Sequence, residues 1–374
     1  MSKKILFTAS VAGHFKAFHL PYLKWFQEQG FETHIACNET TAMKLPFVDK
    51  TWNIDFARNP FSLNNIRALR QLKEIIDREN YTLVNCHTPT ASVVTRLACI
   101  KARKNGTILI YTAHGFHFYK GAPFIYWALF FPVEILLAKI SDAVITINTE
   151  DYLLIKKYGA KNTDYYLIPG IGVDKSSFYP VSLATKTALR KEKKFPLDKK
   201  ILIYAAEFIP RKNHQFIIDS VSKYREMFTS TVILFAGNGR DEESLKKYAE
   251  SLKVNHIIKF IGFRRDIHEI YKLADIGIST SKQEGLGLNL VEEMMCGLPL
   301  IASEDRGHKE IIDHNLNGFL YPQNNKKSFS EAVHKLNTDS NLYSTFSENG
   351  ILKAEKFELS SSLKAVTNIY KNYL

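Results

Sequence analysis

The sequence predicts an α/β protein with two Rossmann-like domains, each built on a parallel β-sheet, that face each other across a cleft. Short apolar runs alternate with helical patterns along nearly the whole chain, as in parallel sheets that are covered on both faces. The alternation stops once, over about residues 176–200, where prolines and a lysine-rich run predict a linker. The length of 374 residues is enough for two domains of ordinary size.

In the first half, short apolar runs predict buried strands. They cover residues 5–8, 33–37, 83–86, 108–112, 144–147 and 166–168. Helical spacing predicts one helix over residues 17–29, which Gly30 closes, and another over residues 63–79. Helical patterns also lie between most of the other strands, so we expect a single parallel sheet in this half.

The same alternation restarts after the linker. Apolar runs predict strands over residues 201–204, 231–236, 257–261, 276–279 and 299–302. The chain then ends in helical stretches over residues 327–337, 342–356 and 360–373. Ligands of such sheets bind outside the carboxyl ends of the strands, so two facing sheets predict a binding cleft between the domains.

The net charge and the cysteine content indicate which kinds of ligand and which cellular compartment suit the protein. The net charge of +12 favours an anionic substrate or an anionic lipid surface. Nucleic acid is the weaker option, because the sequence has no arginine-rich tail, zinc-finger spacing or RNP-like aromatic motif. The four cysteines show no metal-binding spacing, so we expect buried free thiols in a reducing compartment.

The most informative motif joins a glycine-rich turn to a short helix. Glu284 lies in the turn, and Glu292 follows eight residues later in the helix. Backbone N–H groups at the positive end of this helix suit a phosphate, and they belong to Gly285, Leu286, Gly287 and Leu288. Carboxylates beside them suit sugar hydroxyls. Because a diphosphate flanked by sugars is a nucleotide-sugar, we expect that class of ligand.

The pattern Glu-Gly-x-Gly-x4-Glu-x-Met-x-x-Gly-x-Pro, which starts at Glu284, resembles the signature of the retaining glycosyltransferases of family 4. The resemblance implies the GT-B fold, with an N-terminal acceptor domain over residues 1–180. It places the nucleotide-sugar domain over residues 181–356. It also implies that a final helix within residues 357–374 crosses back to the N-terminal domain.

A loop after the first strand of the second half resembles the family motif Gly-Arg-Leu-x-x-x-Lys-Gly, whose cations hold the donor diphosphate. Lys212 matches the lysine, whereas Glu207 stands at the position of the arginine. Arg211 precedes Lys212 in the same loop, so we expect Arg211 to supply the missing positive charge.

Two further stretches follow in the order that the family shows. Gly237 lies in the turn Phe-Ala-Gly-Asn-Gly, and Phe263 and Arg264 stand where family members contact the nucleobase. The resemblance makes these residues candidates for donor binding. Packing at the end of a strand explains Phe263 equally well.

In the first half, Gly13 and His14 occupy the place of a glycine loop that in the family borders the donor phosphates and the acceptor. His114, in the stretch Thr-Ala-His-Gly-Phe-His-Phe, aligns with the active-site histidine of the family, and His117 is a second candidate. The same stretch resembles bacterial exopolysaccharide and capsule transferases of the EpsD type.

An aromatic segment over residues 116–137 is the one membrane-like stretch of the sequence. Pro132 and Glu134 interrupt it, and it is too short to span a bilayer. Two interpretations stay open at this point. The segment is either a buried helix of the core or a helix that rests on an anionic lipid surface, with Lys120 and Lys139 at its ends.

The resemblance implies a retaining enzyme that moves a hexosyl or N-acetylhexosaminyl group from a UDP-sugar to a lipid-diphosphate-linked saccharide, in bacterial surface polysaccharide biosynthesis. The expected catalytic residues are Glu284, His114 and Lys212. No Asp-x-Asp motif occurs in the sequence, so we expect no cofactor and no essential metal. The expected location is the cytoplasm, peripheral on the inner face of the cell membrane.

Two alternatives stay open. A UDP-sugar epimerase can share the same fold, but it cleaves the donor without an acceptor. A non-catalytic membrane-bound assembly subunit would fit the aromatic segment and the basic charge. Turnover of a UDP-sugar would exclude the non-catalytic subunit. Analysis of the products would distinguish an epimerase from a transferase.

Overall fold

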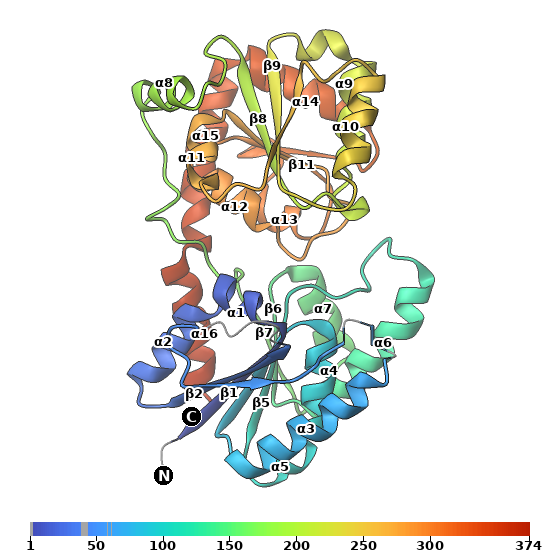
Figure 1. Cartoon of the computed structure of the whole chain (residues 1–374), viewed down its shortest axis with the longest axis vertical. Helices are drawn as coiled ribbons and strands as arrows, with labels where there is room; N and C mark the ends of the chain where they lie inside the picture. Colours follow the sequence, from blue (N-terminus) through green and yellow to red (C-terminus); the bar gives the residue numbers. More distant parts are fainter. Residues whose placement is uncertain (1–2, 39–43, 58, 61) are drawn as a thin grey trace. The chain divides into compact units, whose positions relative to one another are not determined.

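The computed structural model describes residues 3–38, 44–57, 59–60 and 62–374, which form two compact units (Figure 1). The first unit runs to Ile171 and also takes in Ser360–Leu374, whereas the second spans Gly172–Leu359. Each unit contains one parallel sheet with helices on its faces. The predicted α/β class with two Rossmann-like sheets is therefore confirmed.

Within the described residues, the sheet of the first unit has seven parallel strands in the order β3-β2-β1-β4-β5-β6-β7. The strands are β1 Lys4–Val11, β2 Glu32–Asn38, β3 Lys50–Asn53, β4 Leu83–Cys86, β5 Ile108–Ala113, β6 Ala143–Thr146 and β7 Asp164–Leu167. The strand order changes direction at β1, which β2 and β4 flank, and ligands of such sheets bind at the carboxyl ends beside this point.

The predicted helix over residues 17–29 is in fact two helices. α1 (Ala12–Phe18) begins directly after β1, and α2 (Leu20–Glu28) follows after a break at His19. Proline in the first turn of α2 explains the break, because it has no N–H to continue the preceding helix. Gly13 thus lies in a helical turn and not in a glycine loop, and a Cβ at Gly13 would meet no atom of the described residues within 4 Å.

The remaining helices of the first unit pack on one face of its sheet, whereas Phe7 on the other face contacts the rings of Phe26 in α2 and of the C-terminal Tyr370. They are α3 Asn64–Glu79, α4 Pro89–Ala98, α5 Ile100–Lys104, α6 Phe124–Ala138 and α7 Thr149–Tyr158. The core between sheet and helices includes fully buried side chains such as Leu6, Leu72 and Leu109.

The last helix of the chain, α16 (Leu359–Lys371), packs within the first unit. Asn85 Nδ2 donates to the Tyr370 hydroxyl at 2.6 Å, and the Tyr370 and Phe26 rings lie 4.9 Å apart. The Tyr373 hydroxyl donates to Asp164 at 2.5 Å. The expected return of the last helix to the N-terminal sheet is therefore confirmed.

Within the described residues, the sheet of the second unit has six parallel strands in the order β10-β9-β8-β11-β12-β13. They are β8 Lys200–Ala205, β9 Thr231–Ala236, β10 Ile258–Gly262, β11 Ile276–Ser279, β12 Leu300–Ser303 and β13 Gly318–Tyr321. The order changes direction at β8, so the carboxyl ends of β8 and β11 mark the expected crevice.

The helices of the second unit are α8 Leu183–Glu192, α9 His214–Lys223, α10 Glu242–Ser251, α11 Ile267–Leu273, α12 Leu288–Met295, α13 His308–Ile311, α14 Lys326–Thr338 and α15 Ser340–Ala354. Short 3-10 turns supplement them: η1 Pro210–Lys212, η2 Arg225–Phe228 and η3 Glu355–Phe357.

The prediction of a plain linker over residues 176–200 is wrong, because α8 forms inside it and packs on the second unit. Arg190 Nη2 donates to Asp275 Oδ2 at 2.5 Å, and Lys186 Nζ donates to Asp275 Oδ1 at 3.2 Å. Asp275 also accepts from the backbone N–H of Ile201 at 2.8 Å. These charge-assisted bonds satisfy a buried carboxylate and attach α8 to the edge where β8 and β11 begin.

Candidate active site

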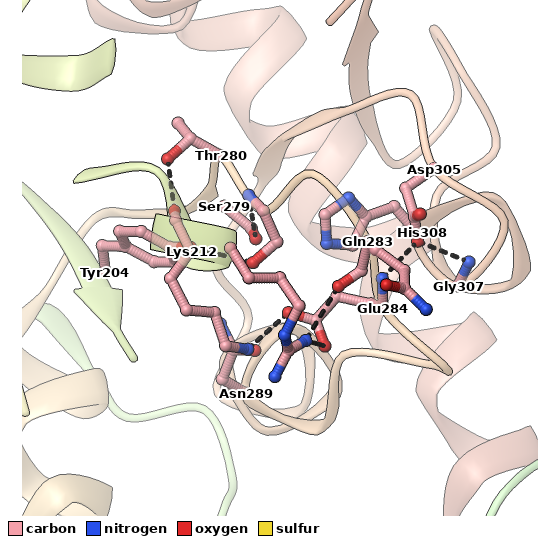
Figure 2. Close-up of polar contacts among 12 residues, drawn as sticks. Tyr204, Lys212, Ser279, Thr280, Gln283, Glu284, Asn289, Asp305, Gly307 and His308 are labelled. Carbon is pink, nitrogen blue, oxygen red and sulfur yellow. Dashed lines mark hydrogen bonds and ion pairs between the residues drawn. The ribbon is translucent and has the colours of Figure 1, made fainter. Parts of the chain in front are cut away.

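The predicted donor residues of the second unit meet where β8 and β11 end. Lys212 closes η1, the short turn after β8, and Glu284 lies in the turn between β11 and α12. The Lys212 ammonium forms an ion pair with Glu284 (Figure 2), and Arg211 Nη1 lies 3.4 Å from Glu284 Oε2. The two predicted cations therefore flank the predicted catalytic carboxylate.

Glu284 is ionised although it is buried. Only 9% of its surface is exposed. Burial favours the neutral acid, but the charges of Lys212 and Arg211 outweigh it and hold the pKa of Glu284 below its usual range. A carboxylate shielded from bulk water in this way interacts strongly with any charge that develops beside it.

The loop after β8 and the turn after β11 are joined by hydrogen bonds. The Tyr204 hydroxyl and Thr280 Oγ1 both donate to the carbonyl of Lys212, at 2.7 and 3.1 Å. Arg211 Nη1 donates to the Gln283 carbonyl at 2.9 Å. The ion pair is thus held by backbone contacts on both sides, which preorganises it for a ligand.

A third loop, after β12, completes this site and was not predicted. Asp305 Oδ1 accepts from the backbone N–H groups of Glu284 at 3.0 Å and Gly307 at 2.9 Å. His308 Nδ1 faces the carbonyl of Ser303 at 2.8 Å, and the buried His308 Nε2 has no hydrogen-bond partner among the residues that the structure describes. The available signal was the polar run Ser-Glu-Asp-Arg-Gly-His directly after a predicted strand, since strand ends hold the ligands of such sheets.

Gly307 allows this third loop to approach the Glu284 turn. A Cβ at Gly307 would lie 2.8 Å from the backbone N and O atoms of Leu286. Gly287 has a φ of +101°, in the left-handed region that favours glycine. These glycines explain why the loops can pack so closely.

The N-terminus of α12 is suited to an anion. Gly287 precedes the helix, and no side chain of the described residues caps it. The first N–H groups of a helix lack intrahelical partners, and the helix dipole places partial positive charge there. With Lys212 and Arg211 beside it, this corner of the second unit can hold a diphosphate.

Glu292 and its neighbour Glu293 lie on α12 in different surroundings. Burial raises the pKa of Glu292 to about 7, although Tyr271 donates a hydrogen bond to it. Glu293 is fully buried, and burial raises its pKa well above the usual range. A Cβ at Gly277 in β11 would lie 2.2 Å from Glu293 Oε2. Glu293, which the sequence analysis did not single out, therefore packs against the sheet.

The other predicted donor residues line one pocket of about 360 Å³ at the carboxyl ends of β8, β9 and β10. It is lined by Ala205, Ala206, Glu207, Ala236, Gly237, Asn238, Phe263, Arg264 and Ile267. A Cβ at Gly237 would lie 2.1 Å from the Ala206 carbonyl, so only glycine fits. Phe263 is 67% exposed, so it is not held in the core, and Arg264 is ion-paired with Asp266 at 2.6 Å.

In the first unit, His14 and His114 lie together at the carboxyl ends of β1 and β5, with ring centroids 4.9 Å apart. His19 and His87, which were not predicted, complete a cluster of four rings. His117 lies apart from the other candidates: it faces Phe130 at 4.8 Å and lines an apolar groove between α3, α4 and α6.

Comparison with known proteins decides the family. The model for "Glycosyl transferases group 1" matches residues 185–353, and that for "Glycosyl transferase 4-like" matches residues 4–148. The chain is 41% identical to the EpsD protein of Bacillus subtilis (strain 168) over 374 residues, which cover 100% of this chain and 98% of that protein. The chain belongs to glycosyltransferase family 4.

Two more distant relatives extend the comparison of this glycosyltransferase. The Escherichia coli UDP-Gal:alpha-D-GlcNAc-diphosphoundecaprenol alpha-1,3-galactosyltransferase is 26% identical over 336 residues, or 85% of this chain and 83% of that one. The crystal structure of Anabaena HepE in complex with UDP aligns with a TM-score of 0.80 at 18% identity, covering 100% of both chains. The glycosyltransferase thus has the GT-B fold.

Proposed function

We propose that this glycosyltransferase moves a hexosyl or N-acetylhexosaminyl group from a UDP-sugar to a lipid-diphosphate-linked saccharide, with retention of anomeric configuration. The observation that carries the proposal is the pairing of Lys212 and Arg211 with the buried, ionised Glu284, beside the uncapped N-terminus of α12. This arrangement places anion-binding groups for a diphosphate beside a carboxylate that can accept hydrogen bonds from the hydroxyls of a sugar.

The donor fits the groups along the carboxyl edge of the second sheet. The diphosphate lies against Lys212, Arg211 and the N-terminus of α12, whose positive charges stabilise the UDP leaving group in the transition state. The neighbouring pocket receives the nucleobase beside Phe263 and Arg264. Glu292 accepts hydrogen bonds from the ribose hydroxyls.

Retention in this proposal does not need a covalent intermediate. Glu284 is engaged by two cations, so it is better suited to hold sugar hydroxyls and stabilise a cationic ring than to attack it. Departure of UDP and attack by the acceptor then take place on the same face of the sugar, and the leaving phosphate assists. We assign His14 and His114 of the first unit to the transferred sugar and the acceptor.

The proposed reaction needs no metal, because cationic side chains and helix-end amides neutralise the diphosphate. EDTA is therefore expected to leave the initial rate within about twofold of the untreated enzyme. The measurement is UDP release from the UDP-sugar in chelator-treated buffer, with and without added Mg²⁺. A strict requirement for Mg²⁺ contradicts the role given to Lys212 and Arg211.

Helix α6 supports a lipid-linked acceptor, because part of it is buried in the core and part of it is apolar and exposed. Trp127 and Phe131 pack against the core, whereas Phe124 is 85% and Leu136 60% exposed. An apolar groove of about 810 Å³ lies between α3, α4 and α6, and it suits the apolar chain of a lipid carrier. In the described part of the chain, no helix is long and apolar enough to cross a membrane.

We therefore propose a cytoplasmic enzyme that binds the membrane surface through the exposed face of α6. The double change Phe124→Ser with Leu136→Ser is expected to weaken sedimentation with anionic liposomes at least about tenfold, because full burial of each side chain is worth ~1.5–3 kcal/mol. UDP binding is expected to stay unchanged.

The matched control for this variant is Leu316→Ser with Leu352→Ser, which removes two leucines that are 59% and 66% exposed in the second unit. This control is expected to sediment like the unchanged protein. If the unchanged protein itself does not bind anionic liposomes, membrane association is wrong and a soluble acceptor becomes the better proposal.

A further inference from the structure

Four histidines from distant parts of the sequence meet in the first unit. His14 lies in α1, His19 at the break between α1 and α2, His87 directly after β4 and His114 directly after β5. One ring nitrogen from each residue can be chosen so that all four lie within 4.8 Å of one another. Strand order explains the meeting, because β1, β4 and β5 are neighbours in the sheet.

The spacing of the rings is close to that of a tetrahedral metal site. A Zn²⁺ ion bound to histidine nitrogens at about 2.0–2.1 Å places pairs of these nitrogens about 3.3 Å apart. His14 Nε2 and His19 Nε2 are 3.1 Å apart, and His87 Nδ1 and His114 Nε2 are 3.3 Å apart. Two pairs of ring nitrogens thus already have the spacing of a tetrahedral site, and one nitrogen from each of the four rings lies within 4.8 Å of the others.

The four rings also contact one another directly. The ring centroids of His19 and His87 lie 3.9 Å apart, and those of His14 and His114 lie 4.9 Å apart. The buried Nε2 of His87 has no hydrogen-bond partner among the described residues, so the hydrogen-bond network of the cluster is incomplete.

The donor set and its exposure indicate which ion fits. Within the described residues the cluster consists of imidazoles alone and includes no carboxylate. Imidazole ligands suit Zn²⁺ or Cu²⁺, whereas Mg²⁺ and Ca²⁺ prefer oxygen. His19 and His87 are buried, but His14 and His114 are partly exposed, which leaves an entry path.

We infer that His14, His19, His87 and His114 form a binding site for one Zn²⁺ ion, and that zinc at this site inhibits sugar transfer. Zinc occupies the ring nitrogens of His14 and His114, which then cannot contact the transferred sugar or the acceptor. The binding site stands on the geometry of the cluster, whereas the inhibition rests on the proposed function.

Zinc binding is tested without any assay of activity. Chain without a polyhistidine tag, treated with chelator and dialysed, is titrated with Zn²⁺ by calorimetry, and bound zinc is counted by elemental analysis. We expect one Zn²⁺ per chain. His19→Gln is expected to weaken binding by more than about tenfold, since even changes behind the metal ligands cost 10–100-fold.

The matched control is His256→Gln, which removes an exposed histidine of the second unit and should leave zinc binding unchanged. Circular dichroism shows whether His19→Gln folds, and His14→Gln, at a partly exposed position, replaces it if it does not. No binding of Zn²⁺ at micromolar concentration, or equal affinity in the cluster variant and the control, overturns the site.

Inhibition is then measured as the rate of transfer against free Zn²⁺. We expect the rate to fall with the same half-saturation as the binding curve, and EDTA to restore it. Stoichiometric binding with an unchanged rate overturns the inhibition and keeps the site. If no sugar is transferred at any zinc concentration, the proposed function fails while the calorimetric result still decides the site.

Discussion

Replacing Glu284 by glutamine is expected to lower the rate of sugar transfer by about a hundredfold, which corresponds to about 3 kcal/mol of transition-state stabilisation. Glutamine keeps the shape of the side chain and can still accept from the Lys212 ammonium, but it carries no charge. The lost contribution is therefore that of the ionised carboxylate beside the developing positive charge of the sugar ring. The measurement is kcat/KM with the UDP-sugar and acceptor.

The control is Glu304→Gln, which removes a half-exposed carboxylate from the neighbouring loop after β12. It should keep near-normal activity, and urea denaturation of both variants checks that the fold is intact. A Glu284→Gln enzyme within about threefold of the unchanged rate would remove Glu284 from the catalytic residues.

Lys212→Ala is expected to weaken UDP binding by about 10–100-fold, since hydrogen bonds to charged groups contribute ~1.5–3 kcal/mol. UDP and the UDP-sugar should lose affinity together, because both contain the diphosphate, whereas uridine, which lacks it, should bind as before. Titration calorimetry with the three ligands separates a loss at the phosphate site from a general distortion of the second unit.

Lys282→Ala is the matched control, because Lys282 is exposed and follows β11 in the same region of the second unit. Its UDP affinity should match that of the unchanged protein. Unchanged UDP affinity in Lys212→Ala would instead indicate that Arg211, and not Lys212, binds the diphosphate.

The sequence predicted most strands of both sheets because buried parallel strands are short apolar runs. It missed β3 (Lys50–Asn53) and β13 (Gly318–Tyr321), each of which lies at one edge of its sheet. β3 has the partly exposed, largely polar sequence Lys-Thr-Trp-Asn, because an edge strand has one neighbour and needs fewer apolar residues. β13 is mostly buried, but it is a run of only four residues, Gly-Phe-Leu-Tyr. The break at His19 was missed because the apolar spacing continues across it.

The candidate site was predictable where functional groups lie in short local motifs, namely the turn that holds Glu284 and the loop that holds Arg211 and Lys212. Glu284, Lys212 and Arg211 were found in this way, and the structure brings them together. Asp305 was missed because its role depends on a hydrogen bond to a turn 21 residues away. His19 and His87 were missed for a similar reason, since only the order of the strands brings them to His14 and His114.

In the aromatic segment, the sequence did not predict which single side chains are buried and which are exposed. Its composition predicted either a core helix or a membrane surface, and α6 has one face packed against the core and one exposed apolar face. Trp127 and Phe131 belong to the buried face, so they are unsuitable as probes of lipid binding. Which face each ring takes follows from packing against the sheet, which composition does not specify.

The central claim is most directly tested by the product formed from a panel of UDP-sugars and a lipid-diphosphate-linked monosaccharide. Mass spectrometry is expected to show an acceptor heavier by one hexose or N-acetylhexosamine for one donor of the panel, with one UDP released per transfer. NMR of the product should show the anomeric configuration of the donor. Consumption of the UDP-sugar with a free epimeric sugar and an unchanged acceptor would contradict the account and identify an epimerase instead.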